Sequence, residues 1–474
     1  MKKLAMIFTA FMLVIGLAAC TDRGATTPPV DDYDNCETPD GDNPCWNVEL
    51  ARFLWEEGAV ITIGVDSDSM GAALVEKWDL DFPDLAGKLQ FRNYGSVNGD
   101  DSGMQGIELA EAEAPDVALV IDNEVIGREG AVFPLHQYFI DLGAEQTHPS
   151  VFAEINILDY FLLPAFYDGM AFAWNQTMLE EWGVDLTDSN ENNLPDAFDT
   201  WEKIFAMADS YGSAVEERPT FRGEPVLEFF PISLGEPWSG YSSLTAGGWQ
   251  LFDEGIMDEP GFDKAEFLAG LEFIQAFSQT NMSVDDTGQK SAGDALGWRW
   301  DAFLEGAYPF GLVGTWMDVE GQTAANDLVI RFSPMPTFEG NQLTPMMKTK
   351  GFVINGFTPY PSAASEVLRW LYTESTMGAM IESSAYLPAL QEDAEIFPQI
   401  DSQMKVEFAV ALLYTKLEPS GTLPNNPAAR AMNVYYNIDI TDFFIDIWDG
   451  LITPEDAQAA IVEAADAWIE ANNE

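Results

Sequence analysis

Short β-branched runs alternate with stretches of helical periodicity from residue 59 onwards, and this alternation limits the folds open to the chain. Residues 59–65 (AVITIGV), 89–92 (LQFR) and 116–121 (DVALVI) have the composition of strands, and residues 71–78 place apolar side chains at helical spacing between the first two. Strands that alternate with helices are typical of parallel sheets. The pattern therefore predicts an α/β fold, in which ligands bind beyond the carboxyl ends of the strands.

Further helices are expected at residues 200–210, 262–279, 365–372 and 454–471. For the last helix, Thr453 is the expected N-cap, and Pro454 stands at the first helical position, where proline is tolerated. Hydrophobic residues make up 47% of the 474 positions, which is enough to fill sizeable cores. A chain of this length predicts two lobes with appended segments.

The chain is strongly acidic, with 79 Asp and Glu against 21 Lys and Arg and a net charge of −58. Such a chain repels phosphate backbones, so we expect no nucleic-acid partner. The acidic residues are spread along the sequence, which indicates a solvated acidic surface rather than a site for a cation. His136 and His148 are the only histidines, and neither stands near another candidate ligand, which argues against a histidine-rich metal centre.

The first twenty residues have the pattern of a lipoprotein signal peptide. Lys2 and Lys3 precede an apolar run over residues 4–16, which is shorter than the roughly 20 residues that a membrane span needs. The run ends in Leu-Ala-Ala before Cys20, which resembles a bacterial lipobox. We therefore expect lipid on Cys20 to anchor the mature protein to the extracytoplasmic side of the membrane. An ordinary secretory peptide with an accidental cysteine is the alternative.

Residues 21–49 are rich in Asp, Pro, Thr and Asn, and we expect a flexible acidic tether over residues 21–57. Cys36 and Cys45 lie within this tether. In an exported protein, two cysteines so close in sequence are candidates for a disulfide, which would stabilise only this region. Two free thiols are the alternative.

No glycine-rich phosphate loop and no Gly-x-Ser-x-Gly nucleophile elbow occurs in the sequence. None of the three cysteines stands where a catalytic nucleophile is expected, because one ends the apolar run and two lie in the tether. The sequence therefore contains no recognisable catalytic motif.

Four segments, in this order, form a signature. They are residues 163–175 (LPAFYDGMAFAWN); residues 237–248 (PWSGYSSLTAGG), followed by a long helix and the turn at 314–316 (GTW); residues 334–355, followed by a helix and residues 385–388 (AYLP); and residues 423–427 (LPNNP) before the terminal helix. Together they resemble the sugar-binding subunits of bacterial ABC importers, in particular the maltose/maltodextrin-binding type, over residues 58–474.

The resemblance implies a two-lobe, periplasmic-binding-protein-like α/β fold with a hinge and a ligand cleft between the lobes. Lobe 1 would hold residues 58–165 and 334–395, and lobe 2 residues 166–333 and 396–474. The implied function is that of a substrate-binding lipoprotein of an ABC transporter. It would capture a carbohydrate, expected to be an oligosaccharide, and deliver it to a membrane permease without chemistry.

A sugar needs aromatic planes for its apolar faces and polar groups for its hydroxyls. The resemblance places a stacking ring at Trp316, for which a place in the core is the alternative. Trp238 and Tyr241 lie in a Gly/Ser-rich loop where family members have an aromatic ring and an acid. Tyr435 and Tyr436 fall near the C-terminal aromatic residue of the family, but its tryptophan is not matched one for one, so maltose itself is not implied.

Polar ligand contacts are expected at the carboxyl ends of the predicted strands. Asp66, Ser67 and Asp68 directly follow the first strand and open the next helix. Asp122 follows the third strand, where the family has a polar contact and where a helix N-cap is the alternative. Asp168 aligns with an acid that the family uses to bind hydroxyl groups, and a solvated loop carboxylate is the alternative.

Residues 188–199 (DSNENNLPDAFD) give a separate signal, the ligand order of an EF-hand-type calcium loop. The predicted oxygen ligands are Asp188, Asn190, Asn192, the carbonyl of Leu194, Asp196 and Asp199. Asn193 replaces the usual glycine at the sixth position, but asparagine tolerates the left-handed conformation needed there. We therefore expect a structural calcium ion and no other cofactor; an acidic surface loop is the alternative.

Two other functions stay open. A surface glycoside hydrolase needs two suitably spaced carboxyl groups, and 79 acids make coincidental pairs unavoidable. The missing catalytic motif and the four family segments favour a binding protein instead. A binder of another small solute, such as a polyamine, is the third possibility, because acid-lined aromatic clefts also suit cations.

Overall fold

The computed structural model describes residues 33–94, 114–121, 131–147, 161–251, 260–288, 300–345, 347–384, 386–391, 394–414 and 430–472. The predicted signal peptide with Cys20, the predicted ligand residue Asp122 and the segment at 423–427 lie outside these residues. Among the described helices, none combines the length and the apolar character that crossing a bilayer requires.

One mixed sheet forms the framework. Within the described residues it has nine strands, in the order β10-β7-β14-β5-β3-β4, with β11 and β15 also on β7 and β6 on β14. These strands are β3 (Ile61–Val65), β4 (Leu89–Asn93), β5 (Val117–Ile121), β6 (Val132–Phe133), β7 (Leu163–Asn175), β10 (Phe310–Gly314), β11 (Ile330–Ser333), β14 (Met347–Asn355) and β15 (Leu387–Pro388). Short hairpins pair β1 (Trp46–Asn47) with β2 (Arg52–Phe53), β8 (Thr220–Phe221) with β9 (Glu224–Pro225), and β12 (Thr337–Phe338) with β13 (Asn341–Gln342).

The expectation of a parallel sheet holds for only part of it. Strand β3 runs parallel to β4 and β5, as the alternation predicted. Strand β14 is antiparallel to both β5 and β7, and β7 is antiparallel to β10 and β11. The prediction is wrong there because strand direction depends on how the chain crosses between the lobes, which no local pattern encodes.

Helices pack on this sheet and, in lobe 2, also on one another. They are α2 (Asp68–Asp81), α3 (Gln137–Gln146), α5 (Gln176–Glu181), α6 (Trp201–Asp209), α7 (Pro237–Leu244), α8 (Ala265–Gln279), α9 (Trp300–Leu304), α10 (Val319–Ala325), α11 (Pro361–Leu371), α12 (Glu374–Glu382), α13 (Gln403–Tyr414), α14 (Arg430–Asn437), α15 (Ile440–Trp448) and α16 (Pro454–Ala471). The predicted cap of the last helix is confirmed, because the Thr453 side chain accepts a hydrogen bond from the Asp456 N–H.

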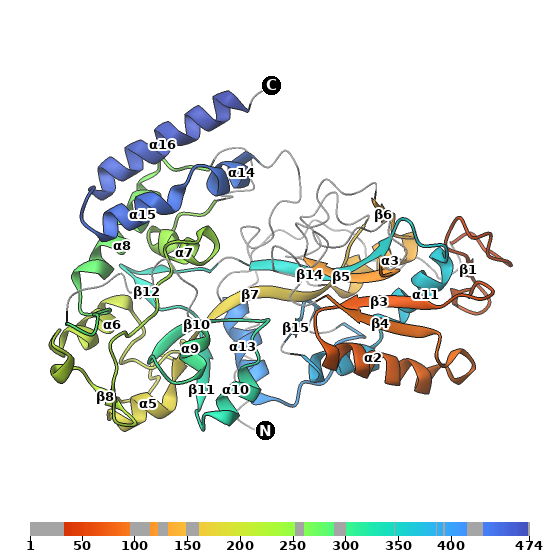
Figure 1. The fold of residues 1–474 in the computed structure, drawn as a ribbon, viewed down its shortest axis with the longest axis horizontal. Coiled ribbons are helices and arrows are strands. Elements are labelled where there is room, and N and C mark those ends of the chain that lie inside the picture. Colours follow the sequence, from red (N-terminus) through yellow and green to blue (C-terminus); the bar gives the residue numbers. More distant parts are fainter. Residues whose placement is uncertain are drawn as a thin grey trace.

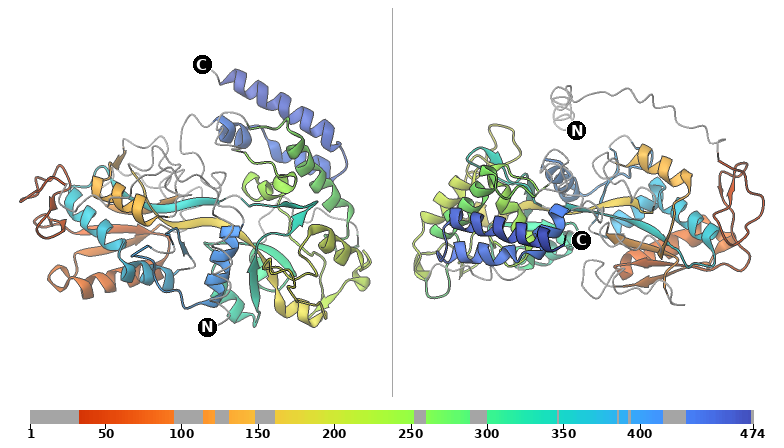
Figure 2. Two further views of the ribbon diagram at one scale, coloured as in Figure 1. Left: turned by 180° about the vertical axis from the view of Figure 1, so that it is seen from behind. Right: turned by 90° about the horizontal axis from the view of Figure 1, so that it is seen from above.

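The two largest hydrophobic cores divide the molecule into two lobes. The lobe 1 core draws on residues 46–166 and 352–390, and the lobe 2 core on residues 167–347 and 387–465. The change-over lies on β7, where Phe166 belongs to the first core and Tyr167 to the second. Strands β7 and β14 pass between the lobes (Figure 1), and Figure 2 shows the two lobes from behind and from above. The α/β, two-lobe fold is therefore as expected.

The segment predicted as a flexible tether is ordered from residue 33 onwards, so that prediction is wrong for residues 33–57. Strands β1 and β2 form a hairpin here, and the side chains of Trp46 and Phe53 are buried in the lobe 1 core. Trp46 also stacks on Tyr138, with 4.7 Å between the ring centroids. Burial of two large aromatic side chains outweighs the polar composition of the segment.

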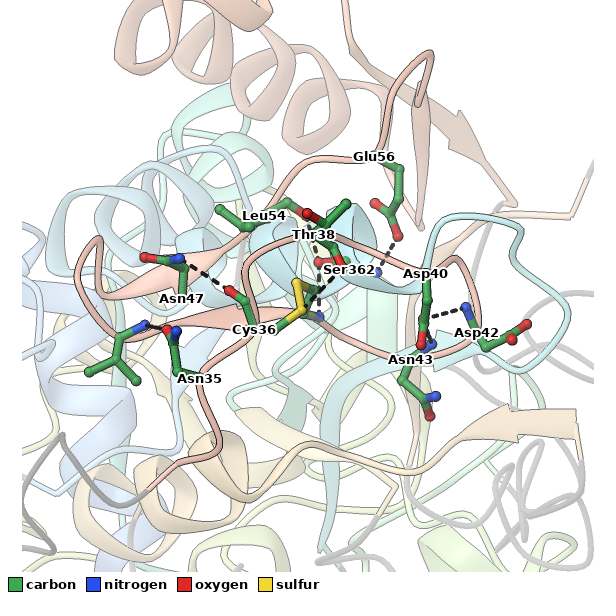
Figure 3. Close-up of a disulfide and its surroundings, with 12 residues drawn as sticks. Asn35, Cys36, Thr38, Asp40, Asp42, Asn43, Asn47, Leu54, Glu56 and Ser362 are labelled. Atoms are coloured by element: carbon green, nitrogen blue, oxygen red, sulfur yellow. Dashed lines mark hydrogen bonds between the residues drawn. A yellow bond between two sulfur atoms is a disulfide. The ribbon is translucent and has the colours of Figure 1, made fainter.

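A disulfide joins Cys36 and Cys45, whose Cα atoms are 5.2 Å apart (Figure 3). The neighbouring backbone is tied to the start of α11. The Cys45 N–H donates to the Ser362 hydroxyl, at 3.0 Å. Glu56 accepts hydrogen bonds from the N–H groups of Ser362 and Ala363, at 2.7 and 2.6 Å, and so caps this helix from a distant part of the chain. The hairpin is therefore part of lobe 1.

Candidate ligand-binding site

Four side chains from separate parts of the sequence meet beside the carboxyl end of β3. Asp66 directly follows β3, Asp168 lies on β7, Lys350 on β14, and Tyr386 just before β15. The Lys350 Nζ atom is 3.6 Å from Oδ2 of Asp66 and 3.5 Å from Oδ1 of Asp168. It also donates to the Tyr386 hydroxyl, which donates in turn to Oδ2 of Asp66. We call these four residues the Lys350 cluster.

The cluster is almost completely removed from solvent. The Lys350 side chain is 0% exposed and that of Asp168 3%, whereas that of Asp66 is 11% exposed. The ring of Tyr386 stacks on Phe166 and faces the Lys350 ammonium, whose Nζ is 4.3 Å from the ring centroid. Burial, reinforced by the charges of Asp66 and Asp168, raises the pKa of Tyr386 well above its usual range. Tyr386 therefore stays protonated and acts as a hydrogen-bond donor to Asp66.

One oxygen of the buried Asp168 carboxylate has no hydrogen-bond donor among the described residues. Within the described residues, its Oδ1 atom accepts no hydrogen bond, although the Lys350 ammonium balances its charge from 3.5 Å. Buried polar atoms without hydrogen bonds are uncommon, and an ionised carboxylate can accept several. Oδ1 of Asp168 can therefore accept hydrogen bonds from donors that the described residues do not supply.

Trp316 lies on the turn after β10 and touches both lobes. The turn after β10 is fastened to β7, since the Thr315 N–H donates to the Gly169 carbonyl at 3.0 Å and the Gly169 N–H to the Thr315 hydroxyl at 3.3 Å. This pairing joins the residue before Trp316 to the residue after Asp168. The half-buried indole packs against the lobe 1 core and the lobe 2 core alike. An aromatic side chain that contacts both lobes and a buried carboxylate thus come from two segments that are hydrogen-bonded to each other.

Ser67 and Asp68 have local roles at the start of α2. The Ser67 hydroxyl caps this helix by accepting a hydrogen bond from the Met70 N–H at 3.3 Å. The exposed carboxylate of Asp68 accepts from the Asn93 side chain at 3.2 Å. These contacts explain why a serine and an aspartate suit these positions without a ligand.

Trp238 and Tyr241 are not in a loop, which corrects the prediction. They lie on helix α7, which begins with Pro237 and is capped by the Glu236 carboxylate. Large apolar side chains three positions apart are the signal of a buried helical face that the sequence reading missed. Trp238 is 9% exposed and Tyr241 0% exposed, both in the lobe 2 core. The Tyr241 hydroxyl accepts from the Leu251 N–H at 3.4 Å.

Tyr435 and Tyr436 lie on α14. Tyr435 is completely buried, and its hydroxyl donates to the Pro237 carbonyl at 2.6 Å. Tyr436 is half-buried, and burial together with the negative charge of Glu236 raises its pKa above the usual range. In this arrangement, Tyr241 and Tyr435 present no surface to a ligand, whereas Tyr436 is partly exposed.

The loop predicted to bind calcium folds tightly. Asn193 has a φ of +65°, the left-handed conformation expected at the sixth position. The carboxylate of Asp188 accepts hydrogen bonds from the N–H groups of Asn192 and Asn193, at 3.2 and 3.0 Å. Asn190 donates to Asp199 at 3.2 Å, and Leu194 donates its N–H to the Asn192 side chain at 3.0 Å.

A lysine already contacts two of the predicted calcium ligands. The Lys203 Nζ atom donates to Oδ1 of Asp199 at 2.6 Å and to the carbonyl oxygen of Asp196 at 2.7 Å. Among the described residues, no group of three or more His, Cys, Asp or Glu side chains is arranged to hold a metal ion. Calcium binding by this loop stays a prediction, and any ion would have to compete with the Lys203 ammonium.

Sequence comparison identifies the family. A family model for bacterial extracellular solute-binding proteins matches residues 107–409, well over half of the chain. The chain belongs to this family. No curated protein sequence matches it. Members of this solute-binding family work outside the cytoplasm, so the same location follows for this chain.

The fold agrees with the family. The structure is similar to the crystal structure of the maltose-binding periplasmic protein MalE from Listeria monocytogenes in complex with maltose, with a TM-score of 0.63 and 14% sequence identity. The match covers 88% of this chain and 99% of the MalE chain. Family and fold are those of binding proteins that catalyse no reaction, and they assign to this solute-binding protein the capture of a substrate.

Reasoning from sequence missed Lys350 and Tyr386, although both lie in or beside the segments that carry the family resemblance. One signal was available: Lys350 stands in a strand pattern that is otherwise apolar or small from residue 349 to 354, in a chain with few basic residues. A lysine in such a place is buried against a carboxylate far more often than it is left alone. Its partners, however, were visible only in the folded chain.

Proposed function

We propose that this solute-binding protein captures a carbohydrate between its two lobes and delivers it to the permease of an ABC importer. One observation carries the proposal: the half-buried indole of Trp316 packs against both cores, and the turn that holds it is hydrogen-bonded to Gly169, the residue after the buried Asp168. A sugar ring supplies what this pair lacks, since its C–H face stacks on an indole and its hydroxyls donate to a carboxylate. The maltose in the similar MalE structure supports a sugar as ligand.

Asp66 extends the proposed site on the lobe 1 side. Its carboxylate follows β3, at the edge of the sheet where α/β folds bind ligands, and it keeps part of its surface exposed. The proposed site consists mainly of Trp316, Asp168 and Asp66. Tyr436 is a candidate ligand contact from lobe 2. Tyr241 and Tyr435 are left out because they are fully buried.

The Lys350 cluster weighs against the two alternatives. A polyamine site needs carboxylates that await a cation, but here the Lys350 ammonium already lies between Asp66 and Asp168. A glycoside hydrolase needs one carboxyl group that donates a proton, whereas both of these carboxyl groups are ion-paired with the same ammonium, which favours their ionised form. A hydroxyl-bearing, uncharged ligand fits this arrangement better than either alternative.

Anchoring by lipid on Cys20 is part of the proposal. The lipobox-like sequence before Cys20 supports it, and so does the extracytoplasmic location that the family implies. An anchored binding protein stays close to the permease that it serves. Labelling of cells with a radioactive fatty acid should mark the wild-type protein and leave a Cys20→Ser variant unmarked.

The test of sugar binding is a thermal-shift panel on residues 21–474. Maltose, maltotriose, cellotriose and xylotriose are added separately, and spermidine serves as the cationic comparison. A ligand at 100 times its dissociation constant stabilises the folded state by about 2.7 kcal/mol, which is a clear shift in Tm. Mass spectrometry of the recovered sugar distinguishes binding from hydrolysis. A shift with spermidine alone, or cleaved sugar, would contradict the proposal.

Trp316→Ala is the decisive variant, and Trp182→Ala is its matched control. Trp182 is also a half-buried tryptophan, but its indole donates to the Thr220 carbonyl on the outside of lobe 2. Both variants lose a large aromatic contact, so both should lower Tm. Only Trp316→Ala should also weaken sugar binding, by roughly thirtyfold, the effect of a stacking residue worth about 2 kcal/mol.

A further inference from the structure

We propose that Lys350 is a positioning residue for ligand binding: its ammonium holds the carboxylates of Asp66 and Asp168 in place so that both face one ligand. The inference rests on the proposed function, because it takes the sugar to bind beside these two carboxylates. No part of the family resemblance points to a lysine at this position, and the assignment comes from the contacts of the folded chain.

Lys350 lies at the junction of three strands. Its backbone is on β14, the strand that passes between the lobes, and it pairs in register with Phe166 on β7. The register of the two strands shifts directly after it, at Gly351, where a Cβ would lie 2.4 Å from the Leu163 carbonyl oxygen. The side chain reaches Asp66 at the end of β3 and Asp168 on β7. The Lys350 ammonium therefore links the carboxyl end of β3, in lobe 1, to β7 and β14, the two strands that pass between the lobes.

The ammonium has no exposed surface, so its charge must be balanced within the protein. Asp66, Asp168 and Tyr386 supply that balance, and they are held by it in turn. The contacts within the cluster use Oδ2 of Asp66 and Oδ1 of Asp168. Among the described residues, Oδ1 of Asp168 is ion-paired but accepts no hydrogen bond, so a sugar hydroxyl can donate to it.

Replacement of Lys350 would disturb binding without touching the ligand. Two carboxylates would then lie buried near each other with no cation between them, and their repulsion would turn at least one away from the site. A purely structural lysine would lower Tm in the same way. A structural role and a positioning role can be told apart by adding a small cation that occupies the place of the missing ammonium. Only a positioning role predicts that this cation restores ligand binding.

Chemical rescue of Lys350→Ala is the test. The substitution removes three methylene groups and the ammonium, which together correspond to propylammonium. We expect Lys350→Ala to bind the panel sugars maltose, maltotriose, cellotriose and xylotriose at least about tenfold more weakly than wild type, a loss of about 1.4 kcal/mol. Propylammonium should restore most of that affinity, whereas 1-propanol, which fills the same space without charge, should not.

Three results would overturn the proposal: wild-type affinity in Lys350→Ala, no rescue by propylammonium in a folded variant, or equal rescue by both additives. If Lys350→Ala does not fold, the triple variant Asp66→Asn, Asp168→Asn, Lys350→Met takes its place, since it removes every charge of the cluster and leaves no unbalanced ion. We expect this variant to fold and to lose sugar binding, and wild-type binding in it would contradict the proposal. Failure of the wild-type protein to bind any panel sugar refutes the proposed function instead.

Discussion

The indole of Trp316 lies directly against Gly314, two residues earlier in the chain. A Cβ at position 314 would come within 2.5 Å of two atoms of the ring, which is closer than real side chains approach. The Gly-x-Trp spacing is therefore a packing requirement: only glycine lets the ring fold back over the end of β10. This position sets the plane on which we propose that a sugar stacks.

Gly314→Ala should displace the Trp316 ring and weaken sugar binding, by about tenfold if roughly 1.4 kcal/mol of stacking is lost. The same substitution at Gly378, on α12, is the control, because a Cβ there would be 3.7 Å from its nearest neighbour, an ordinary contact. Isothermal titration with the sugar that binds wild type measures the difference. Equal affinity of both variants would show that the ring position does not matter.

Removal of the disulfide should destabilise lobe 1 and leave ligand affinity unchanged. A Cys36→Ser, Cys45→Ala variant loses a cross-link over a sequence separation of 9, which is worth about 2–3 kcal/mol. Urea denaturation measures the loss, and a reducing agent should lower the stability of wild type but not of the variant. A fall in sugar affinity would contradict our view that the hairpin only supports lobe 1.

Stability should fall when the pH drops below about 6.5, because His136 must stay neutral in the folded state. Its Nδ1 atom accepts a hydrogen bond from the Tyr138 N–H at 3.2 Å and caps α3. Burial lowers the pKa of His136 below the usual 6.5, an effect that the charges of Asp141 and Asp34 only partly oppose. Between the folded-state pKa and 6.5, the unfolded chain binds more protons, so the free energy of unfolding decreases as the pH falls through this range.

His136→Asn keeps an acceptor for the cap and removes the titrating group. Its Tm should therefore depend less on pH than that of wild type between about pH 5 and 7. His148→Asn is the matched control, since His148 is the only other histidine. If His148→Asn flattened the pH profile and His136→Asn did not, the assignment would be wrong.

If the loop at 188–199 binds calcium, roughly millimolar calcium should raise Tm relative to a chelator. Asp188→Ala should abolish this shift by removing the first ligand. Lys203→Met should strengthen calcium binding, because the Lys203 ammonium now contacts Asp199 and the Asp196 carbonyl. If calcium changed the Tm of neither the wild type nor the Lys203→Met variant, the loop would be an acidic surface turn without a calcium site.

Sequence patterns within a few residues, such as β-branched runs and helix caps, predicted the strands and helices that these same residues stabilise. The run at 59–65 and the helix after it correspond to β3 and α2, and the cap and proline before α16 mark its first turn. Helix α7 was missed because glycine and three serines are weak helix formers. Its cap by Glu236 and the burial of Trp238 and Tyr241 in the lobe 2 core decide its structure instead.

The sequence by itself determined the α/β class, the order of the family segments and three candidate residues that the structure brings to the lobe junction: Asp66, Asp168 and Trp316. Only the tertiary structure decided which of the aromatic candidates are buried, and that Lys350 and Tyr386 join the two carboxylates. The physical reason is distance along the chain. The ion pairs of Lys350 with Asp66 and Asp168 depend on strand order and burial. The neighbours of a charged residue in the sequence do not determine either of these.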